Sequence, residues 1–524
     1  TIQFHGTADR YTLNGAQAVA LLYDTATTAS ANPAVSIMSV GTSGGQAVAY
    51  TFDLARSIVY TRQGNPAWAQ QDRDGIFPVR SNDMFFGAAA TDPQPDWIDL
   101  DKMHIPQADE HQRLLANTIL EVSRDRKPLP RFWYLPNGLK AAVIMTGDDH
   151  GRGGTLARIE QYQTLSTPGC DPANWTPGCL RLTSYLYPNT PISDAQALTL
   201  INQGFELALH PTVSGGSECL DFTEASLQSV FSTQLAEFQV VWPSLPKPTT
   251  NRTHCVVWSD WTTHARVSLA NGIRFDTNYY HFPASWVGNR IGFLYGTGMP
   301  MRFAEINGSM IDVYQAPTHF TDESGQQYPP AADAVLDLAL GPQGYYGMFV
   351  ANMHTDNPVS DDGNGILNSA VPRGVPIVTA RQALEFLDGR NASRFSNLMW
   401  DGTTLSFTMA VGAGATGLQG MVPAQSTAGA LTGMTRNGQP IPFTVQTIKG
   451  VSYGFFSGVA GQYQAVYNVD LIAPVISDVV AAPQADGTAL ITWTTDTPAT
   501  SRVDYGTTPS SLSLTVSSAA LQTS

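Results

Sequence analysis

The sequence is poor in charged side chains, and in cationic ones above all. Asp, Glu, Lys and Arg make up 14% of the 524 residues, against roughly 25% in an average soluble domain. Only 28 Lys and Arg stand against 43 Asp and Glu, which gives a formal net charge of −15. Because nucleic acids and anionic membranes are bound through clustered Lys and Arg, this balance argues against both as partners. No apolar run in the sequence approaches the ~18 residues of a membrane span.

Cysteine is also scarce, with four residues in the chain: Cys170, Cys179, Cys219 and Cys255. No C-x-x-C spacing occurs, so a structural zinc site is not indicated. Cys170 and Cys179 enclose a loop rich in Pro, Asn and Gly that a disulfide could close, which leaves Cys219 and Cys255 as a second pair. The alternative is four free thiols in a cytosolic enzyme. Two disulfides predict an oxidising compartment, and thus a secreted or cell-surface protein. The start at Thr1, without Met or a signal segment, is interpreted as a mature or trimmed product.

The length of the chain suggests three or four domains. The pattern of residues 1–135 predicts that the first is a mixed α/β domain. Strand-like runs alternate with Gly-rich turns, and residues 109–125 form an amphipathic helical pattern. The region resembles the glutamine-amidotransferase-like domains in front of some secreted bacterial hydrolases, without their nucleophilic cysteine. It opens directly in a strand pattern, which suggests an incomplete domain. Ser43 fits G-x-S-x-G, but a nucleophile elbow needs a following helix, and residues 46–52 favour a strand. We interpret Ser43 as part of a turn.

Residues 136–390 change to an alternation of strands and helices. Ser193 and Gln196 form a capping box that opens one helix, and Asn307-Gly308 predicts the turn of a hairpin. Repeating βα units over about 250 residues predict a distorted (β/α) barrel, which would be the catalytic domain.

Residues 391–470 return to strand-like alternation, which predicts a small β-sandwich. Residues 471–524 resemble the first strands of a fibronectin type III module that is cut short, with Trp493 as its core tryptophan. The predicted fold class is therefore multidomain α/β plus β: a barrel flanked by a mixed α/β N-terminal domain and C-terminal β-sandwich modules.

Three strand-like runs of the barrel region end in an acid or an imidazole. In α/β barrels the chemistry gathers at the carboxyl ends of the strands, so these side chains are candidates for one site. Such a pattern is typical of a metal hydrolase. The candidates are Asp148, Asp149 and His150 after residues 141–146, His210 after residues 205–209, and His354 after residues 347–353.

The run T-G-D-D-H-G at residues 146–151 resembles the T-F-D-D-G first motif of polysaccharide deacetylases of carbohydrate esterase family four. The resemblance spans residues 140–390 and extends to the order of the later motifs. It implies a divalent metal, most often Zn²⁺, with Asp148 as general base and Asp149 as metal ligand. Metal-assisted hydrolysis does need one carboxylate on the cation and another free to take a proton.

The family's second motif, H-x-x-x-H, supplies two further ligands. Here His210 matches the first histidine, whereas Ser214 replaces the second. Catalytic zinc normally has three protein ligands, so another residue must complete the site. His254 and His150 are the candidates, and His254 is favoured. The alternative is a protein without metal, in which His210 is a core histidine.

The remaining motifs imply the other catalytic roles. Arg252 stands where the third motif places an arginine that pairs with the base, and Asp276 lies near the fourth motif, whose acid orients the catalytic histidine. The run F-V-A-N-M-H resembles the fifth motif and implies His354 as general acid. Asp148, held ionised by Arg252, would take a proton from water, and His354, kept protonated by Asp276, would deliver one to the leaving group. The alternative is that His354 is a strand-end histidine hydrogen-bonded to Asp356.

The leading hypothesis is a secreted, metal-dependent deacetylase acting on an N- or O-acetylated polysaccharide. One alternative is a metal amidohydrolase or esterase with a non-carbohydrate acyl substrate. Another is a metal-free carbohydrate-binding or cell-surface protein on a degenerate barrel. Aromatic residues close to the motifs would line a sugar-stacking cleft or belong to the core: Trp258, Trp261, Tyr279, Tyr280 and Trp286.

Overall fold

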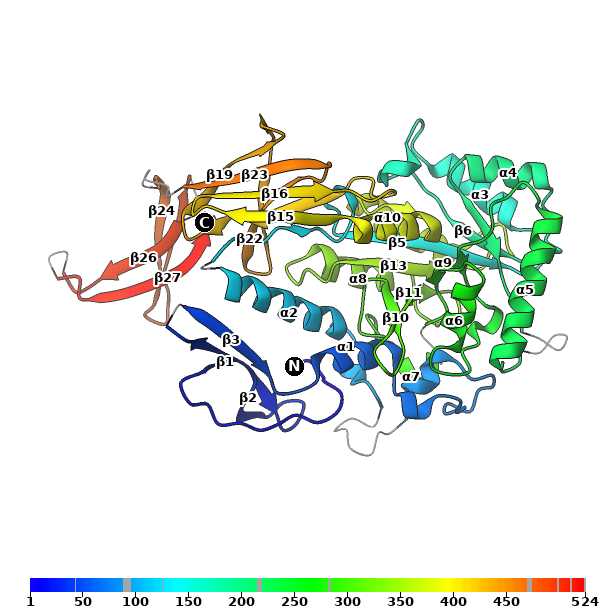
Figure 1. The fold of residues 1–524 in the computed structure, drawn as a ribbon, viewed down its shortest axis with the longest axis horizontal. Helices are drawn as coiled ribbons and strands as arrows, with labels where there is room; N and C mark the ends of the chain where they lie inside the picture. The colour runs from blue at the N-terminus through cyan, green and yellow to red at the C-terminus, as the bar shows by residue number, and fades with distance from the viewer. Residues whose placement is uncertain are drawn as a thin grey trace.

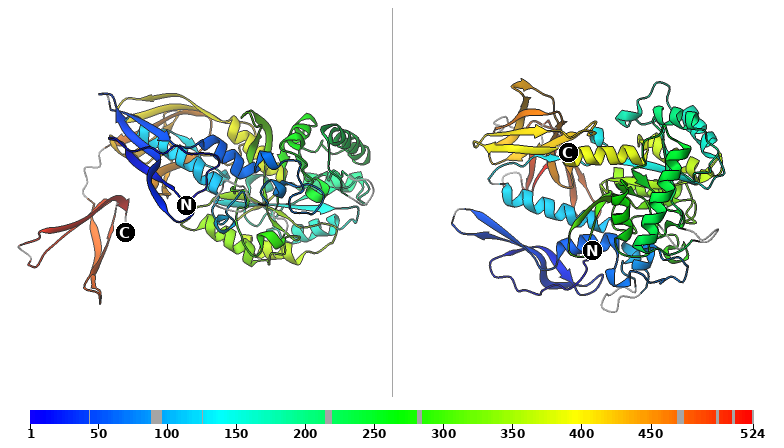
Figure 2. Two further views of the ribbon diagram at one scale, coloured as in Figure 1. Left: turned by 90° about the horizontal axis from the view of Figure 1, so that it is seen from below. Right: turned by 45° about the vertical axis from the view of Figure 1, so that its right-hand side comes forward.

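The computed structural model combines an α/β region with several β-sheets (Figures 1 and 2). In Figure 1 the α/β region lies at the right, and the C-terminal strands and the N-terminal sheet lie at the left. The structure describes residues 1–42, 44–87, 96–124, 126–213, 219–280, 284–468, 474–496, 499–508 and 511–522.

A parallel sheet built around β5 forms the centre of the α/β region. Its strand order is β12-β13-β5-β6-β7, and β14 also pairs with β5. All of these pairs are parallel. The strands are β5 (Ala141–Asp149), β6 (Thr183–Leu186), β7 (Glu206–Leu209), β12 (Thr318–Thr321), β13 (Gly347–Asn352) and β14 (Ile377–Val378).

Strand β5 is buried over its whole length, as the uncharged apolar run at residues 141–146 predicts. Val143 and Met145 pack into one hydrophobic cluster, whereas Ala142 and Ile144 pack into another. Successive side chains of β5 therefore face opposite sides of the sheet.

A second sheet has the order β10-β11-β9-β8. An isolated parallel bridge between Tyr280 and Thr318 joins it to the first. Among the described residues these strands form two sheets, not one continuous ladder, so a closed barrel is not seen. The β10–β11 hairpin turns at the predicted Asn307-Gly308. The strands are β8 (Thr250–Asn251), β9 (Phe275–Asp276), β10 (Met301–Ala304) and β11 (Met310–Gln315).

Helices surround the sheets on the right of Figure 1. Ser193 and Gln196 form the predicted capping box of α4. The helices are α3 (Thr155–Leu165), α4 (Asp194–Asn202), α5 (Glu224–Val241), α6 (Thr263–Ala270), α7 (Ala284–Val287), α8 (Pro330–Leu340), α9 (Asp361–Ala370) and α10 (Ala380–Ala392). In the described part of the chain, no helix combines the length and apolar character that crossing a membrane requires.

The N-terminal region contains the antiparallel sheet β1-β2-β3 and two longer helices. Ser43 lies outside the described residues, and β3 follows shortly after it. The region packs on the α/β region, since Met84 and Phe85 share a hydrophobic cluster with Trp258 and Tyr279. The elements are β1 (Gln17–Tyr23), β2 (Ala29–Val40), β3 (Gly45–Tyr50), α1 (Leu54–Gln63) and α2 (Gln107–Ser123).

Two further sheets, formed by strands after residue 391 together with β4, enclose a hydrophobic core. One sheet has the order β15-β16-β23-β19-β18, with β20 paired to β19, and the other has the order β21-β22-β17-β4. The strands are β4 (Arg131–Phe132), β15 (Arg394–Trp400), β16 (Thr404–Ala410), β17 (Gln419–Pro423), β18 (Gln425–Ser426), β19 (Gly429–Arg436), β20 (Gln439–Pro440), β21 (Thr444–Ile448), β22 (Val451–Ser457) and β23 (Gly461–Asn468).

The last residues form two separate hairpins. Strand β24 (Ile476–Pro483) pairs with β25 (Ala489–Thr495), and β26 (Ala499–Tyr505) pairs with β27 (Leu514–Gln522). Trp493 is only half-buried. A fibronectin type III module stays a prediction.

Two disulfides join Cys170 to Cys179 and Cys219 to Cys255, the pairing that the loop composition favours. Short 3₁₀ turns complete the chain: η1 (Pro66–Trp68), η2 (Ser81–Met84), η3 (Leu100–Lys102), η4 (Pro136–Gly138), η5 (Pro172–Asn174), η6 (His254–Val256) and η7 (Val371–Arg373).

Candidate metal and catalytic site

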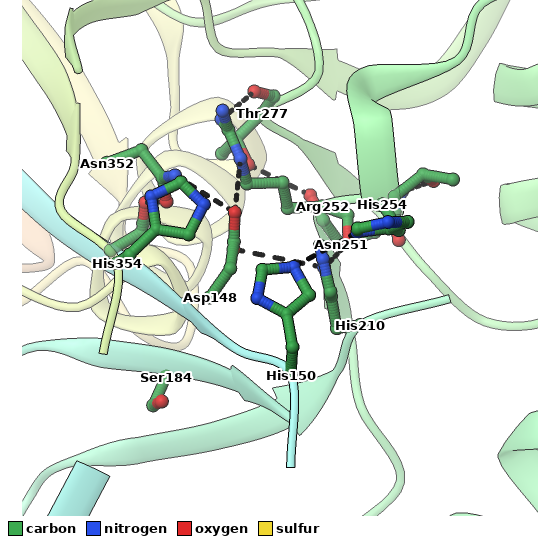
Figure 3. A network of polar contacts seen from close by, with 12 residues as sticks. Asp148, His150, Ser184, His210, Asn251, Arg252, His254, Thr277, Asn352 and His354 are labelled. Atoms are coloured by element: carbon green, nitrogen blue, oxygen red, sulfur yellow. Dashed lines mark hydrogen bonds and ion pairs between the residues drawn. The ribbon is translucent and has the colours of Figure 1, made fainter. Parts of the chain in front are cut away.

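Polar side chains converge where the parallel strands of both sheets end (Figure 3). Because the strands run parallel, their carboxyl ends meet at one edge, where loops can present functional groups. In Figure 3 the rings of His210 and His254 lie on one side of Asp148 and that of His354 lies on the other. Asp148 is the second-last residue of β5, and His150 directly follows the strand. The other residues follow β7, β8 and β13.

Three histidines form the centre of the site: His150, His210 and His254. One ring nitrogen of each lies within 4.8 Å of the others. Nε2 of His150 is 3.0 Å from Nδ1 of His254. Nε2 of His210 is buried and has no hydrogen-bond partner among the residues that the structure describes. A buried polar atom without a partner costs free energy, so this nitrogen requires a ligand or another explanation.

Two of these rings are oriented by hydrogen bonds through their other nitrogen. Nδ1 of His150 is 2.7 Å from Oδ2 of Asp356. The other carboxylate oxygen of Asp356, Oδ1, accepts a hydrogen bond from the backbone N–H of His150. Nδ1 of His210 is 2.7 Å from the carbonyl oxygen of Arg252. Carboxylate and carbonyl partners of this kind hold metal-ligating histidines in the correct tautomer. Burial lowers the pKa of His210 to about 3 and that of His254 to about 4, so both rings are neutral at pH 7 and can donate lone pairs.

The carboxylate of Asp148 has one occupied and one free oxygen. Oδ2 accepts hydrogen bonds from Nε of Arg252 at 3.0 Å and Nδ2 of Asn352 at 2.9 Å. Oδ1 is buried, finds no hydrogen-bond partner in the described part of the chain, and lies 3.8 Å from Nδ1 of His210. Burial alone would raise the pKa of Asp148, but its charge interactions with His210, Arg252 and His354 hold it below the usual range. The group is thus an ionised carboxylate with one oxygen available as a proton acceptor.

The imidazole of His354 carries a proton over a wide pH range. Its Nδ1 is 2.8 Å from Oδ1 of Asp322, and its backbone N–H donates to Oδ2 of the same carboxylate. Burial alone would lower the pKa of His354, but the bond to Asp322 and the charges of Asp148 and Glu323 raise it to about 9. Its ring lies 5.5 Å from that of His150, measured between centroids. A protonated imidazole at this position is a proton donor beside the histidine cluster.

Asp149 does not take the place that the sequence suggests. Its Oδ1 accepts hydrogen bonds from the backbone N–H groups of Arg152 and Gly153. Its Oδ2 accepts from the hydroxyl of Thr155 at 2.7 Å and from the Thr155 N–H at 3.3 Å. Both oxygens therefore hold the turn that leads into α3. His150, the alternative ligand, takes the position beside His210.

Asp276 also lies apart from its predicted partner His354. Its carboxylate accepts hydrogen bonds from Asn278 and Asn251 and lies 3.6 Å from Nδ1 of His264. The acid hydrogen-bonded to His354 is Asp322, which follows β12 and was not among the predicted residues. Glu323 lies 3.9 Å from Nε2 of the same ring. Asp356, suggested as a partner of His354, is bonded to His150 instead.

Most of the aromatic residues near the motifs belong to the core. Trp258, Trp261, Tyr279 and Tyr280 are each at most 6% exposed, so they do not form a stacking surface. Tyr187, half-buried after β6, instead contacts the histidines, and its ring lies 5.4 Å from that of His210. Ser214, the departure from the second motif, lies outside the described residues.

Comparisons with known proteins find solved structures that share low sequence identity and low TM-scores with this chain. No family model matches the chain, and no curated protein matches it. A family 4 acetyl xylan esterase from Clostridium thermocellum, solved with a cobalt ion, is 14% identical with a TM-score of 0.27, over 47% of this chain and 92% of its own. A polysaccharide deacetylase from Bacillus cereus is 11% identical with a TM-score of 0.25, over 45% of this chain and 91% of its own. Agd3, described as a novel carbohydrate deacetylase, is 9% identical with a TM-score of 0.32, over 84% of this chain and 73% of its own. Similarities of this extent establish neither a family nor an activity.

Proposed function

We propose that the chain is a metal-dependent hydrolase that removes acetyl groups from an acetylated polysaccharide. The observation that carries the proposal is the cluster of His150, His210 and His254 beside the ionised Asp148 and the protonated His354. Neutral nitrogen ligands, a free carboxylate and a proton donor are the components of metal-assisted acyl hydrolysis.

The three histidines fit a divalent metal such as Zn²⁺. Catalytic zinc sites commonly use three protein ligands and leave one position open, and a set of three histidines is one of the known combinations. The buried Nε2 of His210 has no partner within the described ranges, and a cation would supply one. Because leaving such a nitrogen unpaired costs roughly 1–3 kcal/mol, the metal-free alternative is disfavoured. Asp149 is not included among the ligands, since both of its oxygens are bonded elsewhere.

A divalent ion bound there supplies Lewis-acid polarisation of the acyl oxygen and a water of lowered pKa. Oδ1 of Asp148 accepts the proton of the attacking water, because Arg252 and Asn352 occupy only Oδ2. His354 donates its proton from Nε2 to the departing oxygen or nitrogen, while Asp322 holds Nδ1. Base and acid are separate side chains of opposite charge, so each can act without first exchanging a proton with the other.

The polysaccharide substrate and the acetyl group are supported by the order of the sequence motifs, which resembles that of family four carbohydrate esterases. Asp148, Arg252 and His354, which come from three of these motifs, meet in one site. The two disulfides are compatible with an oxidising, extracellular compartment in which such polymers occur.

The experiment measures acetate release from a panel of N- and O-acetylated polysaccharides, with the protein stripped by a chelator and reloaded with Zn²⁺ or Co²⁺. We expect release that the chelator abolishes and the metal restores. Release from acetylated small amides or esters, but from no polymer, would favour the non-carbohydrate alternative. Absence of metal binding and of acetate release would refute the proposal.

A further inference from the structure

The disulfide Cys219–Cys255 lies directly beside the histidine cluster. Cys255 follows His254 in sequence, and both sulfur atoms lie within 4.8 Å of a His254 ring nitrogen. At its other end, Cys219 belongs to the segment that follows His210. The disulfide thus joins two segments that each carry a histidine of the cluster.

The turn on which His254 is presented has an unfavourable backbone. Cys255 has a φ of 57° and Val256 a φ of 47°. L-residues rarely adopt this left-handed region, and a β-branched residue such as Val256 does so least of all. Two such residues in succession persist only where surrounding contacts hold them.

The contacts that hold this turn come from three places in the chain. Nε of Arg80, in the N-terminal region, donates to the carbonyl oxygen of Cys255 at 2.9 Å. The backbone N–H of His254 donates to the carbonyl oxygen of Pro211 at 2.8 Å, next to His210. The disulfide adds a covalent bond to these two hydrogen bonds, and it is the strongest of the three links.

We propose that Cys219–Cys255 is a positioning brace for the metal site. It holds the left-handed turn so that His254 stays within reach of the ion that His150 and His210 bind. The inference rests on the proposed function, because it presumes that these histidines bind a metal. Without the disulfide the turn relaxes, and metal binding must then include the cost of restoring it.

The second disulfide of the chain is a matched control. Cys170–Cys179 closes a short loop in front of β6, with a sequence separation of 9. That loop lies at the amino end of the strand, whereas the histidines follow the carboxyl ends of their strands. Removing the Cys170–Cys179 disulfide therefore perturbs this loop and leaves the histidine cluster unchanged.

The first test compares metal affinity in C219S/C255S, in C170S/C179S and in the wild type. Serine keeps thiolates, which bind zinc themselves, out of the measurement. The dissociation constant of Co²⁺ or Zn²⁺ is obtained by competition with a chromophoric chelator. We expect C219S/C255S to bind about 10- to 100-fold more weakly, the range typical for loss of groups that support metal ligands, and C170S/C179S to match the wild type. Equal affinity in all three proteins would refute the brace and leave the metal site standing. If the wild type binds no metal, the proposed function and the brace fail together.

The second test uses the wild type alone and does not depend on the folding of a variant. A water-soluble trialkyl phosphine reduces a disulfide to two thiols, while the phosphine takes oxygen from water and becomes the phosphine oxide. Attack on Cys219–Cys255 requires local opening of the turn, which bound metal opposes. We expect Zn²⁺ to slow reduction of Cys219–Cys255 at least several-fold and to leave Cys170–Cys179 unaffected, with both followed by alkylation and peptide mass spectrometry. Equal slowing of both disulfides, or of neither, contradicts the proposal.

Discussion

Replacing Asp322 by Asn tests whether the proton donor and the metal ligands are separate histidines. The site contains two pairs of nearly equal geometry. Nδ1 of His354 is 2.8 Å from Asp322, with side chains 22% and 22% exposed. Nδ1 of His150 is 2.7 Å from Asp356, with side chains 20% and 23% exposed. D356N is therefore a matched control for D322N, because each substitution removes an acid bonded to Nδ1 of a half-buried histidine, and the two histidines have different proposed roles.

The size of the effect follows from the environment of His354. Burial lowers its pKa, but the bond to Asp322 and the charges of Asp148 and Glu323 raise it from 6.5 to about 9. This displacement corresponds to roughly 3 kcal/mol. D322N removes a hydrogen bond to an ionised partner, worth about 1.5–3 kcal/mol, and leaves the charges of Asp148 and Glu323. We therefore expect the pKa of His354 to fall by about one to two pH units.

Two assays measure this fall. In the pH profile of kcat/KM, activity declines as pH rises through the pKa of the proton donor, so D322N should move this alkaline limb down by one to two units. In urea unfolding of the metal-free protein, a raised pKa stabilises the fold fully below pH 6.5, and this stabilisation is lost as pH rises through about 9. D322N should therefore reduce the free energy of unfolding more at pH 6 than at pH 10.

The control has the opposite pattern. D356N should leave the alkaline limb in place and weaken metal binding about 10- to 100-fold, because Asp356 orients a ligand. Three results would refute the assignment of roles: an unmoved limb in D322N, an equal stability loss at both pH values, or a metal affinity that falls as much in D322N as in D356N.

Three further substitutions test the remaining residues of the site. D148N should lower kcat about 10²- to 10⁴-fold, the usual contribution of a general base, with unchanged metal content by mass spectrometry; retained turnover would remove Asp148 from this role. D149N should lower the melting temperature, since the turn before α3 loses an ionised acceptor, and leave the metal dissociation constant unchanged; a loss of metal affinity without a loss of stability would restore Asp149 as a ligand. N352L should reduce kcat about tenfold with little change in KM, because Oδ2 of Asp148 loses one of its two donors, whereas an equal rise in KM would show that Asn352 acts in binding.

Three strands that carry the site, β5, β7 and β13, could be predicted from the sequence because most of their side chains are apolar on both faces. Strand β5 can be recognised without knowing which strands pair with it, since Thr146 is the one polar residue among its first six. The same holds for β7 and β13, and the residues at their carboxyl ends then follow as candidates. The pairing of Asp148 with Arg252 could be predicted only through the resemblance to a family, since 104 residues separate the two.

The place of Asp149 could have been predicted from strand geometry alone. Side chains alternate between the two faces of a strand, so Asp148 and His150 share one face and Asp149 takes the other. The hydrophobic clusters confirm this alternation along β5, with Val143 in one cluster and Ile144 in the other. The face of Asp148 leads to the histidines, and the face of Asp149 leads to the turn before α3. The motif by itself suggested that both adjacent acids belong to one site. The alternation of side chains instead places Asp148 and His150, which flank Asp149, in the site.

The partner of His354 could not be predicted in this way, because it depends on which strands lie side by side. Strand β12 pairs in parallel with β13, and Thr321 stands opposite Asn352. The residues that leave these two strands therefore emerge together, which brings Asp322 to His354. Strand β12 is only four residues long, and T-H-F-T gives little sign of a buried strand. Asp276 ends β9 in the other sheet, where Asn251 and Asn278 occupy its carboxylate. Asp276 thus stands near the expected motif position in the sequence. The strand order instead brings Asp322, 46 residues later, to Nδ1 of His354.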